Sequence, residues 1–569
     1  MDTQNPAGAS APEPPRPRYS LSINSASVFL AGVAIQAIGF VGSLFVYRFL
    51  GGGTAGQALF GTVQFFLLIA STINSLADVR MGSGYQFFLA RGRPAKANTA
   101  TYLVLRFLLV GGAAAAMFAV SGVSVDGATI ASSPYEFEVL GIFLLLPLLW
   151  TVETVYQNYN IGLGNSVRAQ YPALLEVIVR TPVIIAVAFY SPTMLGLATA
   201  YLAGAAAAAL FSLPGVISLL GKIRWKEGIL LFRYSWPLLG ALGLGTIATS
   251  MIPFVVQASL GAAVLNQFNL ANGFRVLTLA LSTAIVVPLF PYMAALHRRA
   301  DYQGIREGIW NALRYTSMLL IPAVVAISVY RVNILVVINS SYLPAATPLA
   351  ILVISAIPTS LTGIMGVGLA AIGWRRLELF LTAAQVALLF GIAIAFLPPY
   401  GLFPASQGLL SASIAILVSA IAGLALNAFF TRRLMAVHVF PRSIGFIALS
   451  AALSFFAISR ANSYLPAILD LDSAVAQLVL GVVIGGLVYF FVLALVGELA
   501  KEDIRRVGGS LGVPRRWLEI AARLCWRTAT LHVVQPVDVA RVPGLVSGNT
   551  PDVEPIESEV PAGKGPGPG

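Results

Sequence analysis

Fourteen apolar segments constrain the fold of this chain more than any other feature of its sequence. Each is about 20 residues long, the length of helix that crosses the hydrocarbon core of a bilayer, or longer. Only 10% of the 569 residues are charged, whereas soluble domains carry about 25%. Lipid removes the need for a charged surface, so the sequence predicts an all-α polytopic membrane protein. The predicted spans are residues 25–49, 57–77, 99–121, 137–156, 172–190, 194–220, 235–259, 268–290, 313–338, 346–372, 377–397, 407–430, 443–463 and 474–497.

Lysine and arginine residues are divided unevenly between the two sets of connections. Twenty of the 35 basic residues fall in the N-terminus and alternate connections of one side, nine more fall in the C-terminal tail, and only Arg48, Arg331 and Arg460 fall on the other side. Cytoplasmic loops are enriched in these residues. We therefore expect a multi-pass protein of the cell (inner, cytoplasmic) membrane with both termini in the cytoplasm. An error of one span would destroy the alternation, which supports the count of fourteen.

The segments before and after the spans are polar. Residues 1–20 are rich in proline and alanine, and we predict a disordered cytoplasmic N-terminus. Residues 500–530 are basic and amphipathic, which suits a helix on the anionic inner leaflet or a plain solvated helix. Residues 531–569 are predicted to be a disordered tail. The first apolar run, from near Ser25, is too long for a cleavable signal peptide.

The polar residues contain no pattern typical of an enzyme or a metal site. Cys525 is the only cysteine, so no intrachain disulfide can form. The three histidines, His297, His438 and His532, have no metal-ligand spacing. The net charge of +12 is clustered between apolar segments, which suits a membrane surface better than nucleic acid. We expect no enzymatic activity, no cofactor and no nucleic-acid partner.

Two stretches of the chain share a Leu-Gly turn followed by a small-residue span, and the first also has Arg48 just before its turn. Residues 45–93 read FVYRFLGGGTAGQALFGTVQFFLLIASTINSLADVRMGSGYQFFLARGR. Within 232–293, Leu260-Gly261 precedes a span that ends at Pro288. This layout resembles the polysaccharide flippases, such as O-antigen translocases, of the multidrug/oligosaccharidyl-lipid/polysaccharide exporter superfamily. Their Asp-x-Gly-x-Gly element is stretched here, as Asp78, Gly82 and Gly84.

The resemblance covers roughly residues 20–500 and implies an architecture. Two six-helix lobes, at 21–222 and 223–433, would be related by a parallel pseudo-twofold axis, with two further helices at 434–499. The two Leu-Gly turns are 210 residues apart in the sequence. At this offset the matches are few, so the internal repeat is weak: Leu50, Gly51, Gln57, Leu67 and Ala70.

The resemblance also implies a function. A polyprenyl-diphosphate-linked oligosaccharide would cross the membrane through a central cavity that opens alternately to each side, for surface polysaccharide biosynthesis. Membrane lipids, and a glycan polymerase or glycosyltransferases, would be the other partners. Such a cargo carries a diphosphate, which needs fixed cations and donors inside the protein.

Arg275 is the main candidate for binding the diphosphate. It lies within the eighth predicted span, with no acidic residue nearby in the sequence. Guanidinium stays protonated and binds phosphate oxygens with paired donors. Asn269 and Asn272 would share its helix face. The lipid II flippases, a branch of the same superfamily, have a cavity arginine in the corresponding span, and the alternative is an arginine that reaches the interface.

Four other charged residues are weaker candidates. Arg180 lies within the fifth span, where Glu176 can form an i, i+4 ion pair with it. Arg48 ends the first span as either an anchor or a headgroup contact. Glu153, followed by aromatic and amide residues, can contact sugars or mark the membrane interface. Arg106 lies near the inner end of the third span, where we expect it to extend to the interface.

Three other functions fit parts of the sequence. A multidrug or organic-cation exporter of the same superfamily needs a deep carboxylate, whereas the acidic residues here lie toward the cytoplasmic ends. A major-facilitator transporter is suggested by Leu76-Ala77-Asp78-Val79-Arg80, in which the arginine is displaced. A membrane glycan polymerase or ligase needs a long outer loop, and the outer connections are short.

Overall fold

The computed structural model of the chain describes residues 21–78, 81–90, 95–123, 130–372, 374–398, 401–435, 442–469 and 474–496, with a few single positions after residue 435. Within these ranges every regular element is a helix. The predicted disordered ends at 1–20 and 531–569, and nearly all of the basic segment 500–530, lie outside the described residues.

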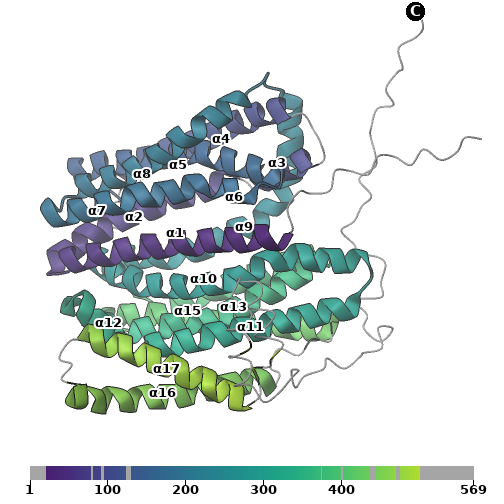
Figure 1. The fold of residues 1–569 in the computed structure, drawn as a ribbon. Helices are drawn as coiled ribbons and strands as arrows, with labels where there is room; N and C mark the ends of the chain where they lie inside the picture. The colour runs from purple at the N-terminus through teal and green to yellow at the C-terminus, as the bar shows by residue number, and fades with distance from the viewer. Residues whose placement is uncertain are drawn as a thin grey trace, which may run out of the picture. The chain divides into compact units, whose positions relative to one another are not determined.

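The helices are labelled in chain order in Figure 1. They are α1 (Leu21–Leu50), α2 (Thr54–Ala77), α3 (Met81–Ala90), α4 (Ala95–Val120), α5 (Pro134–Gly162), α6 (Ser166–Ala169), α7 (Tyr171–Tyr190), α8 (Met194–Ser218), α9 (Trp225–Leu260), α10 (Ala262–Arg298), α11 (Tyr302–Val329), α12 (Arg331–Ile338), the 3-10 helix η1 (Ser340–Ala345), α13 (Ala346–Ala371), α14 (Arg375–Phe396), the 3-10 helix η2 (Ala405–Gln407), α15 (Gly408–Met435), α16 (Arg442–Leu469) and α17 (Ala474–Val496).

The described residues contain twelve helical segments that are long and apolar enough to cross a membrane, and each overlaps a predicted span. The other two predicted spans, 235–259 and 268–290, lie within α9 and α10, which have 36 and 37 residues. Each of these two helices is about 54 Å long at about 1.5 Å per residue, more than the roughly 30 Å of hydrocarbon. The chain is an all-α polytopic membrane protein, as predicted.

The structure differs from the predicted spans in two places. The span predicted at 313–338 is two helices, because α11 ends at Val329 and α12 begins at Arg331. The connection after Asp78 contains the ten-residue helix α3, which the pattern of spans does not predict. Helices as short as α3 and α12 have no apolar run of about 20 residues, and that run is the signal by which a membrane span is recognised in a sequence.

The first compact unit consists of Met1–Val46 and Ile69–Leu238, with Arg506–Arg515. Within it α5 packs against α8 and α4, and α7 packs against α8 (Figure 1). Phe143 of α5 contacts Tyr201 of α8 with ring centroids 5.8 Å apart. The boundary predicted between the lobes, at 222/223, falls inside this unit, and the two six-helix lobes stay a prediction.

The second compact unit consists of Tyr47–Leu68 and Leu239–Arg505, with Arg516–Gly569. Within it α13 packs against α10, α11 and α15. Its core holds buried side chains from these helices, among them Met293, Ile309, Leu313, Ile364, Leu369 and Met435. Because α1 and α2 are continuous helices, each contributes residues to both units.

The last two helices, α16 and α17, pack on each other and on α11 of the second unit (Figure 1). Tyr489 of α17 donates a hydrogen bond to the Met318 carbonyl of α11 at 2.9 Å. Arg314 of α11 forms an ion pair with Glu498, just after α17, and both side chains are 1% exposed. Ser443 of α16 donates to the same carboxylate at 2.6 Å. One ion pair with its hydrogen bonds therefore joins α11, α16 and the end of α17.

Glycines on α17 make this packing possible, and the packing predicts a mutational effect. A Cβ at Gly481 would overlap the buried Tyr330 hydroxyl, whereas a Cβ at Gly486 would meet nothing within 4 Å. We expect Gly481→Ala to destabilise the protein by about 1–3 kcal/mol, as overpacking does. We expect Gly486→Ala to leave stability unchanged or slightly raised. Thermal unfolding of the detergent-solubilised protein, followed by size-exclusion chromatography, checks both variants, and equal melting temperatures would contradict this packing.

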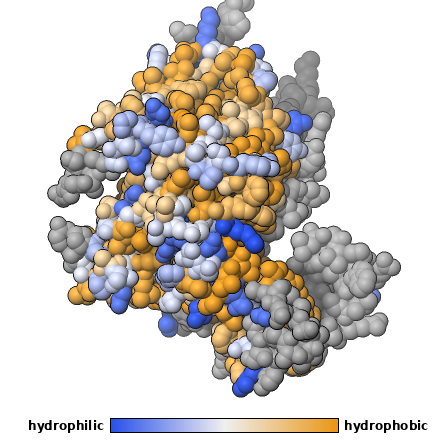
Figure 2. Space-filling view, turned by 90° about the vertical axis from the view of Figure 1, so that its left-hand side faces the viewer, coloured by the Kyte–Doolittle hydropathy of each residue, from blue (hydrophilic) through white to orange (hydrophobic). Residues whose placement is uncertain are grey.

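The surface of the protein suits a lipid environment. Hydrophobic residues cover broad areas of the face in Figure 2, and polar residues gather in separate patches. Many large apolar side chains of the described helices are exposed, for example Leu210 at 67%, Ile229 at 68% and Leu487 at 68%. In water such areas would favour aggregation, whereas in a bilayer they contact hydrocarbon.

Candidate substrate-binding site

Arg275 lies near the middle of α10, which begins after Gly261 with its φ of 85°. The positive φ suits a residue without a Cβ, so this glycine allows the sharp turn between α9 and α10. The guanidinium of Arg275 is directed toward α13. Its Nε donates to Ser355 Oγ at 3.0 Å and its Nη2 is 3.4 Å from Thr359 Oγ1. On its own helix Asn272 Oδ1 accepts from Nη1 at 3.4 Å.

Arg275 forms no ion pair with any residue that the structure describes. Three other arginines of the spans do: Arg106 with Asp78, Arg180 with Glu176, and Arg314 with Glu498. The partners of Arg275 are neutral hydroxyl and amide groups. An uncompensated cation in a membrane helix is costly, and a residue that carries this cost usually marks a functional site. This arrangement can accept an anion without first breaking an ion pair.

Ser355 and Thr359 were not predicted as site residues. They lie four residues apart on α13, and both hydroxyls also donate within the helix, to Leu352 O at 2.6 Å and Ser355 O at 2.8 Å. Hydroxyls that bond their own helix in this way are common in membrane helices. The only available signal was a pair of hydroxyl residues at i, i+4 spacing, and nothing in the sequence indicated that α13 lies beside α10.

The two asparagines predicted near Arg275 have different partners. Asn272 contacts the guanidinium, as expected from its position one turn away. Asn269 instead donates to Gln64 of α2 at 3.0 Å. Gln64 in turn donates to the Tyr47 hydroxyl at 2.6 Å. Of the two, only Asn272 lies in the first layer of groups around Arg275.

Arg180 and Glu153 lie in the first unit, beside Glu176. Arg180 Nη1 donates to Glu176 Oε1 at 2.9 Å, which is the i, i+4 ion pair that the sequence allowed. The guanidinium also lies over the Tyr201 ring, 5.2 Å from its centroid. Glu153 is buried, and its carboxylate accepts from Gln157 Nε2 at 2.7 Å. The charge of Arg180 is therefore already shared with a carboxylate, and its role in binding stays a prediction.

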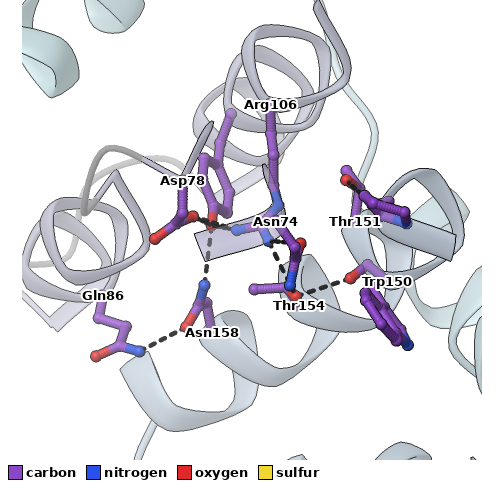
Figure 3. Close-up of polar contacts among 10 residues, drawn as sticks. Asn74, Asp78, Gln86, Arg106, Trp150, Thr151, Thr154 and Asn158 are labelled. Atoms are coloured by element: carbon purple, nitrogen blue, oxygen red, sulfur yellow. Dashed lines mark hydrogen bonds and ion pairs between the residues drawn. The ribbon is translucent and has the colours of Figure 1, made fainter. Parts of the chain in front are cut away.

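Arg106 is the residue for which the prediction was wrong. Instead of extending to the membrane interface it is 1% exposed and forms an ion pair with Asp78. Its Nη2 donates to Asn74 at 2.7 Å and to Thr154 at 3.3 Å, as Figure 3 shows. Asp78, Asn74 and Thr154, which lie outside its own helix, accept from its two terminal nitrogens, and the pattern of a single helix cannot reveal such partners.

The same polar cluster extends to α3. The Tyr102 hydroxyl donates to Asp78 at 2.9 Å and accepts from Asn158 Nδ2 at 2.9 Å. Asn158 Oδ1 accepts from Gln86 of α3 at 2.7 Å (Figure 3). The cluster thus connects the end of α2 with α3, α4 and α5 inside the first unit. Each charge in it has a partner, so we assign it a structural role.

Arg48 lies at the end of α1 and is exposed. Its Nη1 donates to the Val337 carbonyl of α12 at 3.3 Å, and its own carbonyl accepts from Asn339 at 3.4 Å. These contacts fit the anchoring role that the sequence left open. Among the described residues no group of three His, Cys, Asp or Glu side chains is placed to bind a metal ion.

Comparison with solved structures identifies the fold. The lipid II flippase MurJ, in an inward closed conformation, superposes with a TM-score of 0.66 over 83% of this chain and 98% of its own, at 13% identity. A multidrug resistance MATE family transporter of the MOP superfamily, in an outward-facing conformation, gives 0.56 over 74% and 97%, at 15% identity. A MOP superfamily transporter from Pyrococcus furiosus gives 0.53 over 73% and 96%, at 16% identity. No family model and no curated protein sequence matches the chain.

These similarities extend over nearly the whole of each solved structure. Identity of 13–16% establishes the shared fold and leaves the cargo open. The chain therefore has the fold of the solved lipid II flippase and MATE transporters, which is the fold that the resemblance implied.

Proposed function

We propose that the protein is a flippase. It would accept a polyprenyl-diphosphate-linked oligosaccharide at the inner leaflet of the cytoplasmic membrane and release it at the outer leaflet for surface polysaccharide biosynthesis. Alternating access to a central site would move the cargo, and no covalent bond would be made or broken. Glycan polymerases or glycosyltransferases would act before and after it.

Arg275 carries this proposal. Moving a diphosphate into hydrocarbon without compensation costs many kcal/mol. A guanidinium that forms no ion pair with the described residues, surrounded by the hydroxyls of Ser355 and Thr359, supplies a positive charge and directional donors. The residues that hold Arg275 are neutral, so its charge remains available to an anion.

The extent of the structural similarity also supports a flippase. The solved lipid II flippase covers 83% of this chain, compared with 74% for the multidrug transporter, and its TM-score is higher. The protein so named moves a lipid-linked saccharide, which has the chemistry that the Arg275 site would recognise.

A multidrug exporter is the second candidate, and one observation favours it. Glu153 is 6% exposed and accepts a hydrogen bond from the neutral Gln157. A buried carboxylate of this kind can attract an organic cation. The two candidates differ in the sign of the charge that they recognise, so one experiment separates them.

Deleting the gene in the source cell tests the proposal. We expect one lipid-linked saccharide to accumulate, detected by mass spectrometry of lipid extracts and assigned to the cytoplasmic leaflet by its protection from an added glycosidase in intact cells. The parent gene should restore its export. If no saccharide accumulates and the cells become sensitive to organic cations, the exporter is the correct function.

A further inference from the structure

A cavity of about 170 Å³ lies between α11, α16 and α17, all within the second unit. These three helices pack on one another (Figure 1). Side chains that are too short to fill the space between three helices leave a cavity there. Six of the residues around it are of this kind: Ala323, Ala326, Ala451, Ser454, Gly485 and Gly486.

The polar groups around the cavity already have hydrogen-bond partners. Ser454 donates to the Gly485 carbonyl at 3.1 Å. Pro322 has no N–H to donate to the Met318 carbonyl one turn earlier, and the Tyr489 hydroxyl donates to that carbonyl instead, at 2.9 Å. The described residues that line the cavity include no charged side chain. A buried water needs about two to four polar partners, so these walls favour an apolar occupant.

The cavity lies about halfway along the predicted spans. Ser454 is near the middle of span 443–463, and Gly485 is near the middle of span 474–497. The chains of the two leaflets meet at the middle of the roughly 30 Å of hydrocarbon. The ends of lipid chains are therefore the part of the bilayer found at this depth.

The cavity borders the lipid-facing surface of α17. Val482 lines the cavity and is 45% exposed, and Val479, one turn earlier, is 57% exposed. Gly486 lies one turn after Val482, and a Cβ there would meet nothing within 4 Å. The hydrocarbon that covers α17 in a bilayer is therefore continuous with the cavity.

The cavity is separate from the Arg275 site. Its described lining comes from α11, α16 and α17, whereas Arg275 lies on α10 and contacts α13. A transporter holds its cargo for only part of each cycle, whereas bilayer phospholipid surrounds the protein at all times. Side chains that face unfilled space lose dispersion contacts, so a permanently available chain suits the cavity better than a transient cargo.

We propose that this cavity, which we call the α17 cavity, binds the end of one acyl chain of a bilayer phospholipid. An apolar cavity of about 150 Å³ in another protein takes up benzene, so the α17 cavity has room for a chain segment of about six carbons. The chain fills the space beside Gly485 and Gly486 and packs between α11 and the α16–α17 hairpin. The inference goes beyond the proposed function and does not depend on the identity of the cargo.

Photo-crosslinking with a defined lipid tests the proposal. Full-length protein is placed in vesicles of phosphatidylethanolamine and phosphatidylglycerol that contain a small fraction of phosphatidylcholine with a diazirine at the end of one acyl chain. After irradiation, mass spectrometry of the digested protein locates the adducts. We expect adducts on Ala451 and Ser454, which line the cavity and, at 1% and 3% exposed, are out of reach of lipid on the outer surface.

Two variants fill the α17 cavity from opposite walls. Gly486→Leu does so from α17 and Ala326→Leu from α11. We expect each to lower the labelling of Ala451 and Ser454 by about tenfold, because a close-packed side chain leaves the acyl chain no room. We expect both to keep the melting temperature of the parent, so the loss of label reports the cavity.

A glycine on the exposed surface of α16 provides the matched control. A Cβ at Gly445 would also meet nothing within 4 Å, but Gly445 does not line the cavity, so Gly445→Leu should leave the labelling unchanged. Labelling that persists in both filled variants would overturn the proposal, and so would the absence of label from Ala451 and Ser454 in the parent.

Polyprenyl phosphate distinguishes the two sources of a hydrocarbon chain. Added to the vesicles in an amount equal to the diazirine lipid, it should leave the labelling of Ala451 and Ser454 unchanged. Loss of the label would show that the α17 cavity takes the chain of a polyprenyl carrier, which would overturn its assignment to a phospholipid.

Discussion

Arg275→Ala is expected to abolish export of the lipid-linked saccharide while the protein remains folded and inserted. The substitution removes the cation that compensates the diphosphate, and hydrogen bonds to charged groups contribute about 1.5–3 kcal/mol each. Losing two of them corresponds to a decrease in transport of about 100-fold or more. The measurement is surface glycan in the deletion strain, with variants compared at equal protein levels.

Arg275→Lys separates charge from geometry. Lysine keeps the positive charge but lacks the planar pair of donors that binds two phosphate oxygens. We therefore expect partial export, between the parent and the alanine variant.

Arg460→Ala is the control, because this exposed arginine lies over the Phe456 ring at 5.3 Å and has no assigned role in transport. Normal surface glycan with Arg275→Ala would remove the basis of the proposed function.

The stability of the Arg275 variant distinguishes a functional residue from a structural one. Arg275 has no carboxylate partner among the described residues, so its removal leaves no buried carboxylate without a counter-charge. Removing a cation from the interior of a membrane helix also removes a desolvation cost. We expect the melting temperature of Arg275→Ala to equal or exceed that of the parent.

Asp78→Asn is expected to have the largest effect on stability. It leaves the nearly buried Arg106 guanidinium without its counter-charge, and breaking a buried ion pair typically costs about 3–5 kcal/mol. The hydrogen bonds from Arg106 to Asn74 and Thr154 remain, but they carry no negative charge. Protein level in the membrane and thermal unfolding in detergent measure the loss.

The second half of a double-mutant cycle checks the cause. In Asp78→Asn with Arg106→Gln both charges are absent, and the neighbouring hydroxyl and amide groups can still bond the new amides. We expect this pair to recover much of the stability that the single variant loses. Glu307→Gln, at an exposed carboxylate that accepts from Gln303, should change stability by less than about 0.5 kcal/mol. A single Asp78→Asn as stable as the parent would show that the ion pair contributes little.

Composition and hydropathy predicted the fold class because a bilayer imposes a strong and local rule on sequence. A span must be apolar over about 20 residues, and that signal does not depend on what the helix packs against. The short helices α3 and α12 were not predicted, because a helix of ten or eight residues does not have to be apolar over its whole length in the way that a membrane span does. The division at Tyr330 was also hidden, because both sides of it are apolar.

The candidate site was predictable only in part, because the sequence does not show which side chains from distant helices contact a given residue. Arg275 could be identified from its own position in an apolar segment, and Asn272 from helical spacing. Ser355 and Thr359 lie 80 and 84 residues away in sequence from the guanidinium that they contact. Arg106 shows the same limit: its distance from the end of a span suggested solvent, whereas a carboxylate 28 residues earlier in the chain binds it.

The ion pair between Arg314 and Glu498 has a consequence for how such a chain can vary. The last two helices follow the others in sequence, and a terminal hairpin is usually the easiest part of a protein to gain or lose. Here Ser443 and Glu498 complete the surroundings of an arginine that belongs to α11. A shorter descendant that kept Arg314 would retain a guanidinium whose carboxylate had gone. Loss of the hairpin and replacement of Arg314 are therefore coupled steps, and a related chain that ends near residue 435 should carry a neutral side chain at that position.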